Sequence, residues 1–201
     1  MKRESRKSNL PGVVEVCGEL VLKNGQNIEG IFRIATNIES RNKAKDAFNQ
    51  LNADLVDLTK FSNESDAPIL AASLLKDYLR DLPTPLLTFE LYHEFLEAQD
   101  NYENIRSKDS EESKKVQIKA IKQIISKLEE NNRILLFYLL KVMNITSKNS
   151  SVNKMTSFNL AIVLAPNILR PKIEDMEYSL MIPKVNAVIE FLITNYESWL
   201  N

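Results

Sequence analysis

The chain has 201 residues, of which 44% are hydrophobic, and its formal net charge is −1 at pH 7. This length suits a single domain with a substantial core, and the near-zero charge gives no support for nucleic-acid binding. Four glycines and seven prolines are too few for the many tight turns of a barrel or sandwich, so helices are favoured.

One cysteine, Cys17, is present, so an intrachain disulfide is excluded and a reducing compartment is favoured. Cys17 lies on the apolar stripe of the first predicted helix, and we expect a buried thiol rather than a reactive one. No run reaches the ~18 apolar residues of a membrane span, and the N-terminus lacks the hydrophobic region of a signal peptide. We therefore expect a cytoplasmic protein.

Residues 1–9 form a basic N-terminal tail, in which Lys and Arg outnumber a single acid. Two interpretations of this tail stay open. The first is a disordered chain end, which we favour. The second is a weak contact that recruits the protein to the anionic inner membrane surface, at ~1 kcal/mol per basic residue near that surface.

Three helices are predicted in the N-terminal half. Residues 11–24 form the first, because a proline opens it, apolar residues recur at helical spacing and a glycine follows. A loop precedes a more polar helix over residues 39–52. A third helix over residues 68–82 is ended by a Pro-Thr-Pro sequence, which cannot continue it.

The middle of the chain predicts three further helices. A fourth helix covers residues 88–99, and the charged, apolar-poor segment 101–112 is expected to be a long surface loop. Helical spacing resumes over residues 112–128. Residues 134–143 are apolar nearly all round, which is typical of a central buried helix, and the polar run 147–153 is expected to end it.

Two helices complete the prediction. A short helix over residues 157–165 should stop at Pro166, and a last helix over residues 178–196 has Pro183 at or near its start. Strand alternation, internal repeats and low-complexity segments are missing from the sequence. The prediction is an all-α, single-domain helical bundle of about eight to nine helices over residues 10–201.

Arg33 stands in an apolar segment, Gly30-Ile31-Phe32-Arg33-Ile34-Ala35. An unpaired guanidinium cannot be buried cheaply, so we expect it to point outward from a loop that its apolar neighbours anchor. A cation held in this way suits neutralisation of a phosphate that belongs to another molecule. An ordinary surface arginine is the alternative, and these six residues alone favour it.

Lys76 and Arg80 are spaced i, i+4 and share one face of the third predicted helix. From spacing alone, a solvated face neutralised by Asp77 and Asp81 is the preferred interpretation. The other interpretation is that the two cations face an anionic partner or a set of carbonyl groups.

Other candidates for chemistry are few. Asn159 begins an otherwise apolar helix, where capping is its expected role and a contact with a partner is the alternative. The only histidine, His93, has no nucleophile nearby in the sequence and is expected to be structural or solvated. Metal-ligand clusters and a phosphate-binding GxxxxGK[ST] loop are missing, so we expect no metal and no cofactor.

Three blocks of sequence resemble the RhoGAP domain family, which activates GTP hydrolysis by Rho-family small GTPases. In the order of that family they read EGIFR (29–33), ASLLKDYLRDLPTPLL (72–87) and VNKMT through NLA to APN (152–167). The similarity spans about residues 10 to 197. The resemblance implies a helical bundle that is not an enzyme itself and that supplies a catalytic group to a GTP-bound partner.

The resemblance also implies roles for five residues. Arg33 would be an arginine finger, entering the site of a Rho, Rac or Cdc42-like GTPase that itself holds GTP and Mg²⁺. Lys76 would contact the GTPase, and Arg80 would support the finger loop. Asn159 would touch the GTPase near its switch regions, and Pro166 would be a further surface contact.

The sequence departs from the family pattern after the finger, where Ala35-Thr36 replaces a frequent Ser-Gly. If that glycine takes a positive φ, a β-branched threonine would resist the same conformation. Ala165 replaces a glycine before Pro166, which is a smaller change. The function implied by the resemblance is GTPase activation, and the alternative is a Rho-family GTPase-binding module without catalytic effect.

Overall fold

The computed structural model describes residues 9–105, 110–173 and 175–200, so residues 1–8 of the predicted basic tail lie outside the described residues. Within those ranges the chain is helical and contains no strand, which confirms the all-α prediction. The α-helices of the described ranges are α1 (Gly12–Leu20), α2 (Ile38–Gln50), α3 (Ala67–Arg80), α4 (Tyr92–Ile105), α5 (Ser110–Ile125), α6 (Glu130–Lys148), α7 (Ser150–Asn153), α8 (Ser157–Ile168) and α9 (Met176–Thr194).

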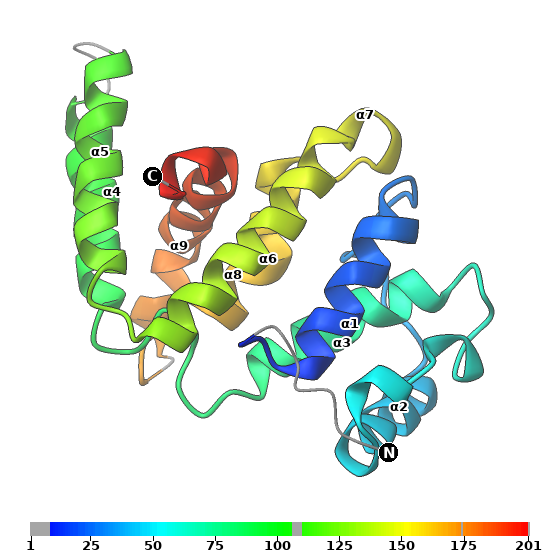
Figure 1. Cartoon of the computed structure of the whole chain (residues 1–201). Helices are drawn as coiled ribbons and strands as arrows, with labels where there is room; N and C mark the ends of the chain where they lie inside the picture. Colours follow the sequence, from blue (N-terminus) through cyan, green and yellow to red (C-terminus); the bar gives the residue numbers. More distant parts are fainter. Residues whose placement is uncertain (1–8, 106–109, 174, 201) are drawn as a thin grey trace.

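Helices α1 and α3 pack against each other in one half of the bundle (Figure 1). Pro11 caps the start of α1, and the chain then continues through a π-helical turn, Val21–Gly25, so the predicted helix is present with a widened last turn. Cys17 is fully buried on this helix, as predicted, and burial raises the pKa of its thiol well above the ordinary value. Cys17 is therefore a core residue and not a reactive thiol.

Close approach of α1 to α6 depends on Gly18. A Cβ atom at this position would lie 2.4 Å from the hydroxyl oxygen of Tyr138 and 2.6 Å from its Cε1. The Tyr138 hydroxyl in turn donates a hydrogen bond to the carbonyl of Glu15 at 3.3 Å. The absence of a side chain at Gly18 therefore lets an aromatic ring of α6 cross the backbone of α1.

The second half of the bundle consists of α6, α8 and α9, with the α4–α5 hairpin beside α9 (Figure 1). Both prolines expected near helix ends lie inside helices, Pro166 in α8 and Pro183 in α9. Proline removes the hydrogen bond to the carbonyl four residues earlier, and in both cases that residue, Ile162 or Ser179, is exposed. Water can satisfy the freed carbonyls, so the helices continue.

The predicted loop over residues 101–112 is wrong, because α4 extends to Ile105 and α5 begins at Ser110. Polar side chains of the two helices bond to one another within the α4–α5 hairpin. Gln117 donates to Gln99 at 2.8 Å in a buried contact, and Gln99 donates to Glu103 at 2.9 Å. These two bonds give the buried amide groups partners on the neighbouring helix and within α4, although the Gln117 Oε1 itself accepts no hydrogen bond.

The polar run 147–153 does not simply end the sixth helix, which corrects another prediction. Helix α6 is longer than the predicted 134–143 and runs through Lys148, and the short helix α7 follows directly. Asn153, the last residue of α7, is fully buried. Across the described residues, no helix combines the length and the apolarity needed to cross a bilayer.

Candidate functional site

The loop that carries Arg33 lies between the π-helical turn and α2. The backbone N–H groups of Arg33 and Ile34 both donate to the carbonyl of Gly30, at 2.8 and 2.9 Å. Ile31 and Phe32 are buried and anchor the loop, whereas Arg33 is exposed. Ile34, which the sequence placed among the anchors, is 42% exposed and lies on the surface beside the guanidinium.

A tight backbone turn presents Arg33. Gly30 has a φ of 72° and Phe32 has a φ of 70°, and a bulky residue in this left-handed region is unusual. Such a conformation costs on the order of 1–3 kcal/mol and persists only where surrounding contacts hold it. Ala35 and Thr36, by contrast, do not have a positive φ. The expected conflict at Thr36 therefore does not arise, and the unusual backbone lies before the arginine.

Lys76 on α3 stabilises this turn through a hydrogen bond. Its ammonium group donates a hydrogen bond to the carbonyl oxygen of Phe32, the residue with the unusual φ. Burial lowers the pKa of Lys76, the negative charge of Asp77 opposes this shift, and the positive charges of Arg41 and Arg80 add to it. Within the isolated domain, Lys76 thus contacts the loop that carries Arg33.

Arg80, the last residue of α3, pairs with one acid of this helix and with the acid that follows it. Its guanidinium lies 2.7 Å from Asp77 and 3.4 Å from Asp81. Asp77 is only 4% exposed and also receives Lys45 at 3.1 Å and Arg41 at 3.5 Å, both from α2. The sequence suggested solvated neutralisers here, but Asp77 is a buried carboxylate that joins α2 to α3.

The pKa of Asp77 reflects this environment. Burial alone would raise it, but the hydrogen bonds from Lys45 and Arg80 and their positive charges lower it by more, so the pKa lies below its ordinary value. One carboxylate is thereby surrounded by three cations, and Lys76 lies next to it in α3. Positive charge is in excess on this side of the Arg33 loop.

Asn153 ties the loop to the other half of the bundle, and sequence reasoning missed it. Its side-chain amide donates to the carbonyls of Gln26 and Thr146, both at 2.9 Å, and its Oδ1 accepts from the N–H of Met155 at 2.8 Å. Its own carbonyl accepts from the N–H of Gly30 at 2.8 Å. Its place in the VNKMT block was the only signal that could have pointed to it.

Asn159 lies in the first turn of α8, shortly after α7, and Pro166 lies near the C-terminal end of the same helix. The cap of α8 is Thr156, whose hydroxyl accepts from the N–H of Asn159 at 3.2 Å, so the expected capping role of Asn159 is wrong. The Asn159 side chain instead donates to the carbonyl of Lys154 at 2.8 Å. Lys154 has a φ of 60°, and this bond fixes the turn that leads from Asn153 into α8.

Exposed apolar residues accompany these polar groups. Ile34 lies on the Arg33 loop, Val152 directly precedes Asn153, and Phe158 directly precedes Asn159. Exposed apolar side chains next to fixed cations are typical of a protein-binding surface rather than of a closed catalytic pocket. The arrangement can offer one guanidinium to an anion held by another macromolecule.

A family model described as the RhoGAP domain matches residues 11–173, and the chain belongs to this family. Rho GTPase-activating protein gacR of Dictyostelium discoideum is 34% identical over 200 residues, covering 98% of this chain and 24% of that protein. Human Rho GTPase-activating protein 44 is 38% identical over 161 residues, covering 80% of this chain and 18% of that protein. The chain thus spans a quarter or less of these two relatives.

Solved structures agree with this family. Human Rho GTPase activating protein 15 superposes with a TM-score of 0.80 at 26% identity, covering 98% of this chain and 87% of that one. The BH domain of GRAF, described as the GTPase regulator associated with focal adhesion kinase, superposes with a TM-score of 0.77 at 25% identity. The match covers 95% of this chain and 96% of that one.

Replacement of Asn153 by Ala should destabilise the protein by at least about 2 kcal/mol, because two carbonyls and one N–H lose their buried partner. Urea unfolding followed by circular dichroism measures this. Asn159→Ala is the matched control, since it removes one bond from a less buried site and should cost less than about 1 kcal/mol. Equal losses of stability in the two variants would contradict the conclusion that Asn153 ties the loop to the rest of the bundle.

Asp77 should make stability depend on acid pH. Its folded pKa is depressed, so its contribution is complete above the unfolded value of about 3.9 and disappears as the pH falls through the folded value. Asp77→Asn should therefore lose about 1–3 kcal/mol at pH 7, and this difference from the wild type should shrink below about pH 4.

Urea unfolding at a series of pH values from neutral to strongly acidic tests the role of Asp77. Asp81→Asn is the control, because that carboxylate is 55% exposed and its pairs with Lys45 and Arg80 should contribute little. A difference between Asp77→Asn and wild type that stayed constant with pH would contradict an ionised, cation-bound Asp77.

Proposed function

We propose that this domain accelerates GTP hydrolysis by a Rho-family small GTPase, with Arg33 as an arginine finger supplied in trans. The observation that carries the proposal is the way Arg33 is presented. Its side chain is exposed, while the backbone on its N-terminal side is held by the Phe32 carbonyl bond to Lys76 and by the Gly30 bond to Asn153. A fixed backbone reduces the ordering entropy that insertion costs.

The guanidinium would act on charge that develops during phosphoryl transfer. The partner would hold GTP and Mg²⁺ and would orient the attacking water, and Arg33 would stabilise the negative charge on the transferred phosphoryl group. An arginine finger of this kind is worth ~10³ to 10⁵ in rate, or about 4 to 7 kcal/mol. The domain needs no nucleotide site of its own for this role.

The surface around Arg33 supports a GTP-bound protein as the partner. Lys76, Arg80 and Arg41 provide an excess of positive charge near the loop, which favours approach of an anionic site. The relatives named as Rho GTPase-activating proteins support the Rho family as the source of that site. Under this proposal Asn159 and Pro166 belong to the same contact surface.

A GTPase-binding module without catalytic effect was the alternative. It depended on a finger loop reshaped by Thr36, and Thr36 needs no left-handed φ. The strained residue, Phe32, precedes the arginine and is held by Lys76. This backbone geometry supports the catalytic proposal over the binding module, and GTP hydrolysis and binding by an Arg33 variant separate the two functions.

Arg33→Ala should abolish most of the acceleration, by roughly 10³-fold or more, while binding to the GTP-loaded partner persists. Single-turnover GTP hydrolysis by a panel of Rho-family GTPases measures the first effect, and binding to the same GTPases loaded with a non-hydrolysable GTP analogue measures the second. Lys148→Ala, an exposed cation paired with Glu197, is the control and should behave as wild type. Binding without acceleration by the wild-type domain would establish the binding module instead.

Lys76→Met should lower the maximal rate at saturating domain by roughly tenfold, because the Phe32 carbonyl loses a charged hydrogen-bond donor while the aliphatic stem remains. The same single-turnover assay, run over a range of domain concentrations, separates maximal rate from half-saturation. Lys43→Met is a matched control on an exposed lysine. If only the half-saturating concentration rose, Lys76 would be a contact to the GTPase, as the family resemblance implies.

A further inference from the structure

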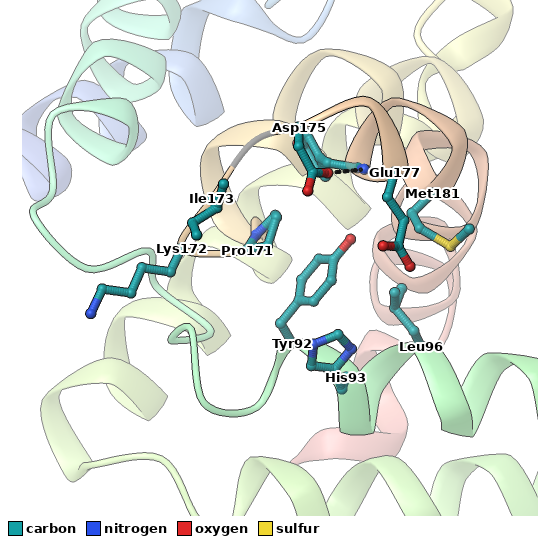
Figure 2. Close-up of a pocket in the computed structure, with 10 residues that line it drawn as sticks. Tyr92, His93, Leu96, Pro171, Lys172, Ile173, Asp175, Glu177 and Met181 are labelled. Atoms are coloured by element: carbon teal, nitrogen blue, oxygen red, sulfur yellow. Dashed lines mark hydrogen bonds between the residues drawn. The ribbon is translucent and has the colours of Figure 1, made fainter.

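A second concave site lies away from the Arg33 loop, between α4 and the start of α9. The pocket has a volume of about 330 Å³ and is drawn in Figure 2. Its apolar walls come from both helices and from the segment that leads into α9. These wall residues are Leu96, Pro171, Ile173 and Met181.

The Tyr92 hydroxyl points into this pocket without a partner. Tyr92 is only 3% exposed, and its hydroxyl oxygen is buried and forms no hydrogen bond in the structure. In Figure 2 the hydroxyl is directed toward the side of the pocket where Asp175 and Glu177 lie. Because a buried hydroxyl without a partner is costly, this orientation indicates that a bound group completes the site.

Two carboxylates converge on the same space. Asp175 accepts one hydrogen bond, from the N–H of Tyr178 at 3.0 Å, which leaves its second oxygen available. Figure 2 places the Glu177 carboxylate between Met181 and Leu96, on the pocket side of α9. Within the described residues, neither carboxylate forms an ion pair with a basic side chain.

The basic residues near the pocket do not pair with Asp175 or Glu177. The Lys172 ammonium points away from the pocket in Figure 2, and Lys184 on α9 is paired with Asp100 at 2.6 Å. His93 is exposed at the pocket edge. Burial and then the charges of Tyr178, Glu177 and Asp175 raise the pKa of Tyr92 to about 12, so the hydroxyl stays neutral and able to accept a hydrogen bond.

We propose that this pocket binds an organic cation, namely a primary ammonium or guanidinium group carried on an apolar stem such as a lysine or arginine side chain. The cation would donate to the Tyr92 hydroxyl and to the carboxylates of Asp175 and Glu177. The stem would pack on the apolar walls, as long basic side chains do elsewhere.

Size and surroundings fit this ligand. A volume of about 330 Å³ lies at the lower end of small-molecule sites, which suits one side chain rather than a nucleotide. Ile173 lines the pocket and is exposed, and Met176 and Leu180 are exposed in the first two turns of α9. These apolar residues could contact residues that flank a lysine or arginine in a peptide. The pocket uses none of the residues that hold the Arg33 loop.

NMR titration of the full 201-residue chain tests the proposal with defined probes. Nα-acetyl-lysine methylamide should shift the Met181 methyl and Tyr92 ring signals at millimolar concentration, and the neutral analogue Nα-acetyl-norleucine methylamide should bind roughly tenfold more weakly or not at all. Butylamine distinguishes the sources. Equal affinity would indicate a free amine, and weaker affinity would indicate a side chain within a polypeptide. Equal binding of the lysine and norleucine probes would overturn the proposal.

Two variants test which pocket residues bind the lysine probe. Tyr92→Phe removes only the hydroxyl, and Glu177→Gln removes one exposed charge without burying a new group, so the fold should survive both. Each should weaken lysine-probe binding by about threefold to tenfold. Glu197→Gln, on an exposed carboxylate outside the pocket, should leave binding unchanged. Unchanged affinity in both pocket variants would overturn the assignment, and Tyr92→Phe should also keep or raise the unfolding temperature, because it removes an unpartnered group.

Discussion

The buried amide of Asn153 is the constraint on which the geometry of the Arg33 loop depends. It lies where the end of α6, the turn into α8 and the segment before the loop meet, and all of its side-chain polar groups are bonded. Water cannot replace a lost hydrogen-bond partner of a buried amide, so the groups that bond to Asn153 must stay in place. The carbonyl of the same residue fixes Gly30, and the position of the loop is thereby coupled to the packing of the helical core.

Electrostatics act on the other side of the loop through α3. Lys76 contacts the strained Phe32 turn. Its neighbour Asp77 joins α2 to α3 through two cations of α2, Lys45 and Arg41, and also pairs with Arg80 of its own helix. The unfavourable φ of Phe32 persists because burial and Lys76 both oppose its relaxation. The strained backbone and the charged hydrogen bond that holds it therefore lie directly before Arg33, the residue that would enter a partner under the proposed function.

Much of the candidate site was visible in the sequence. Arg33, Lys76 and Arg80 stood out by residue type and spacing, and the motif blocks connected them. The sequence did not reveal which contact each of these residues makes. A hydrogen bond between residues 44 positions apart, such as that between Lys76 and Phe32, leaves no local pattern in the sequence. Asn153 was read as part of a polar helix end for the same reason. Asp77 looked solvated, since a charged residue on a helix indicates burial only when its partners are known.

The sequence by itself determined that the protein is an all-α bundle, because apolar periodicity, few glycines and helix-stopping signals are local properties. It also determined that Arg33 is an isolated cation in an apolar segment. Only the tertiary structure decided that the backbone strain lies at Phe32 and not at Thr36, and that α4 and α5 replace a loop. It alone revealed an unpartnered hydroxyl at Tyr92. These features depend on which distant groups become neighbours, and packing of the whole chain sets those distances.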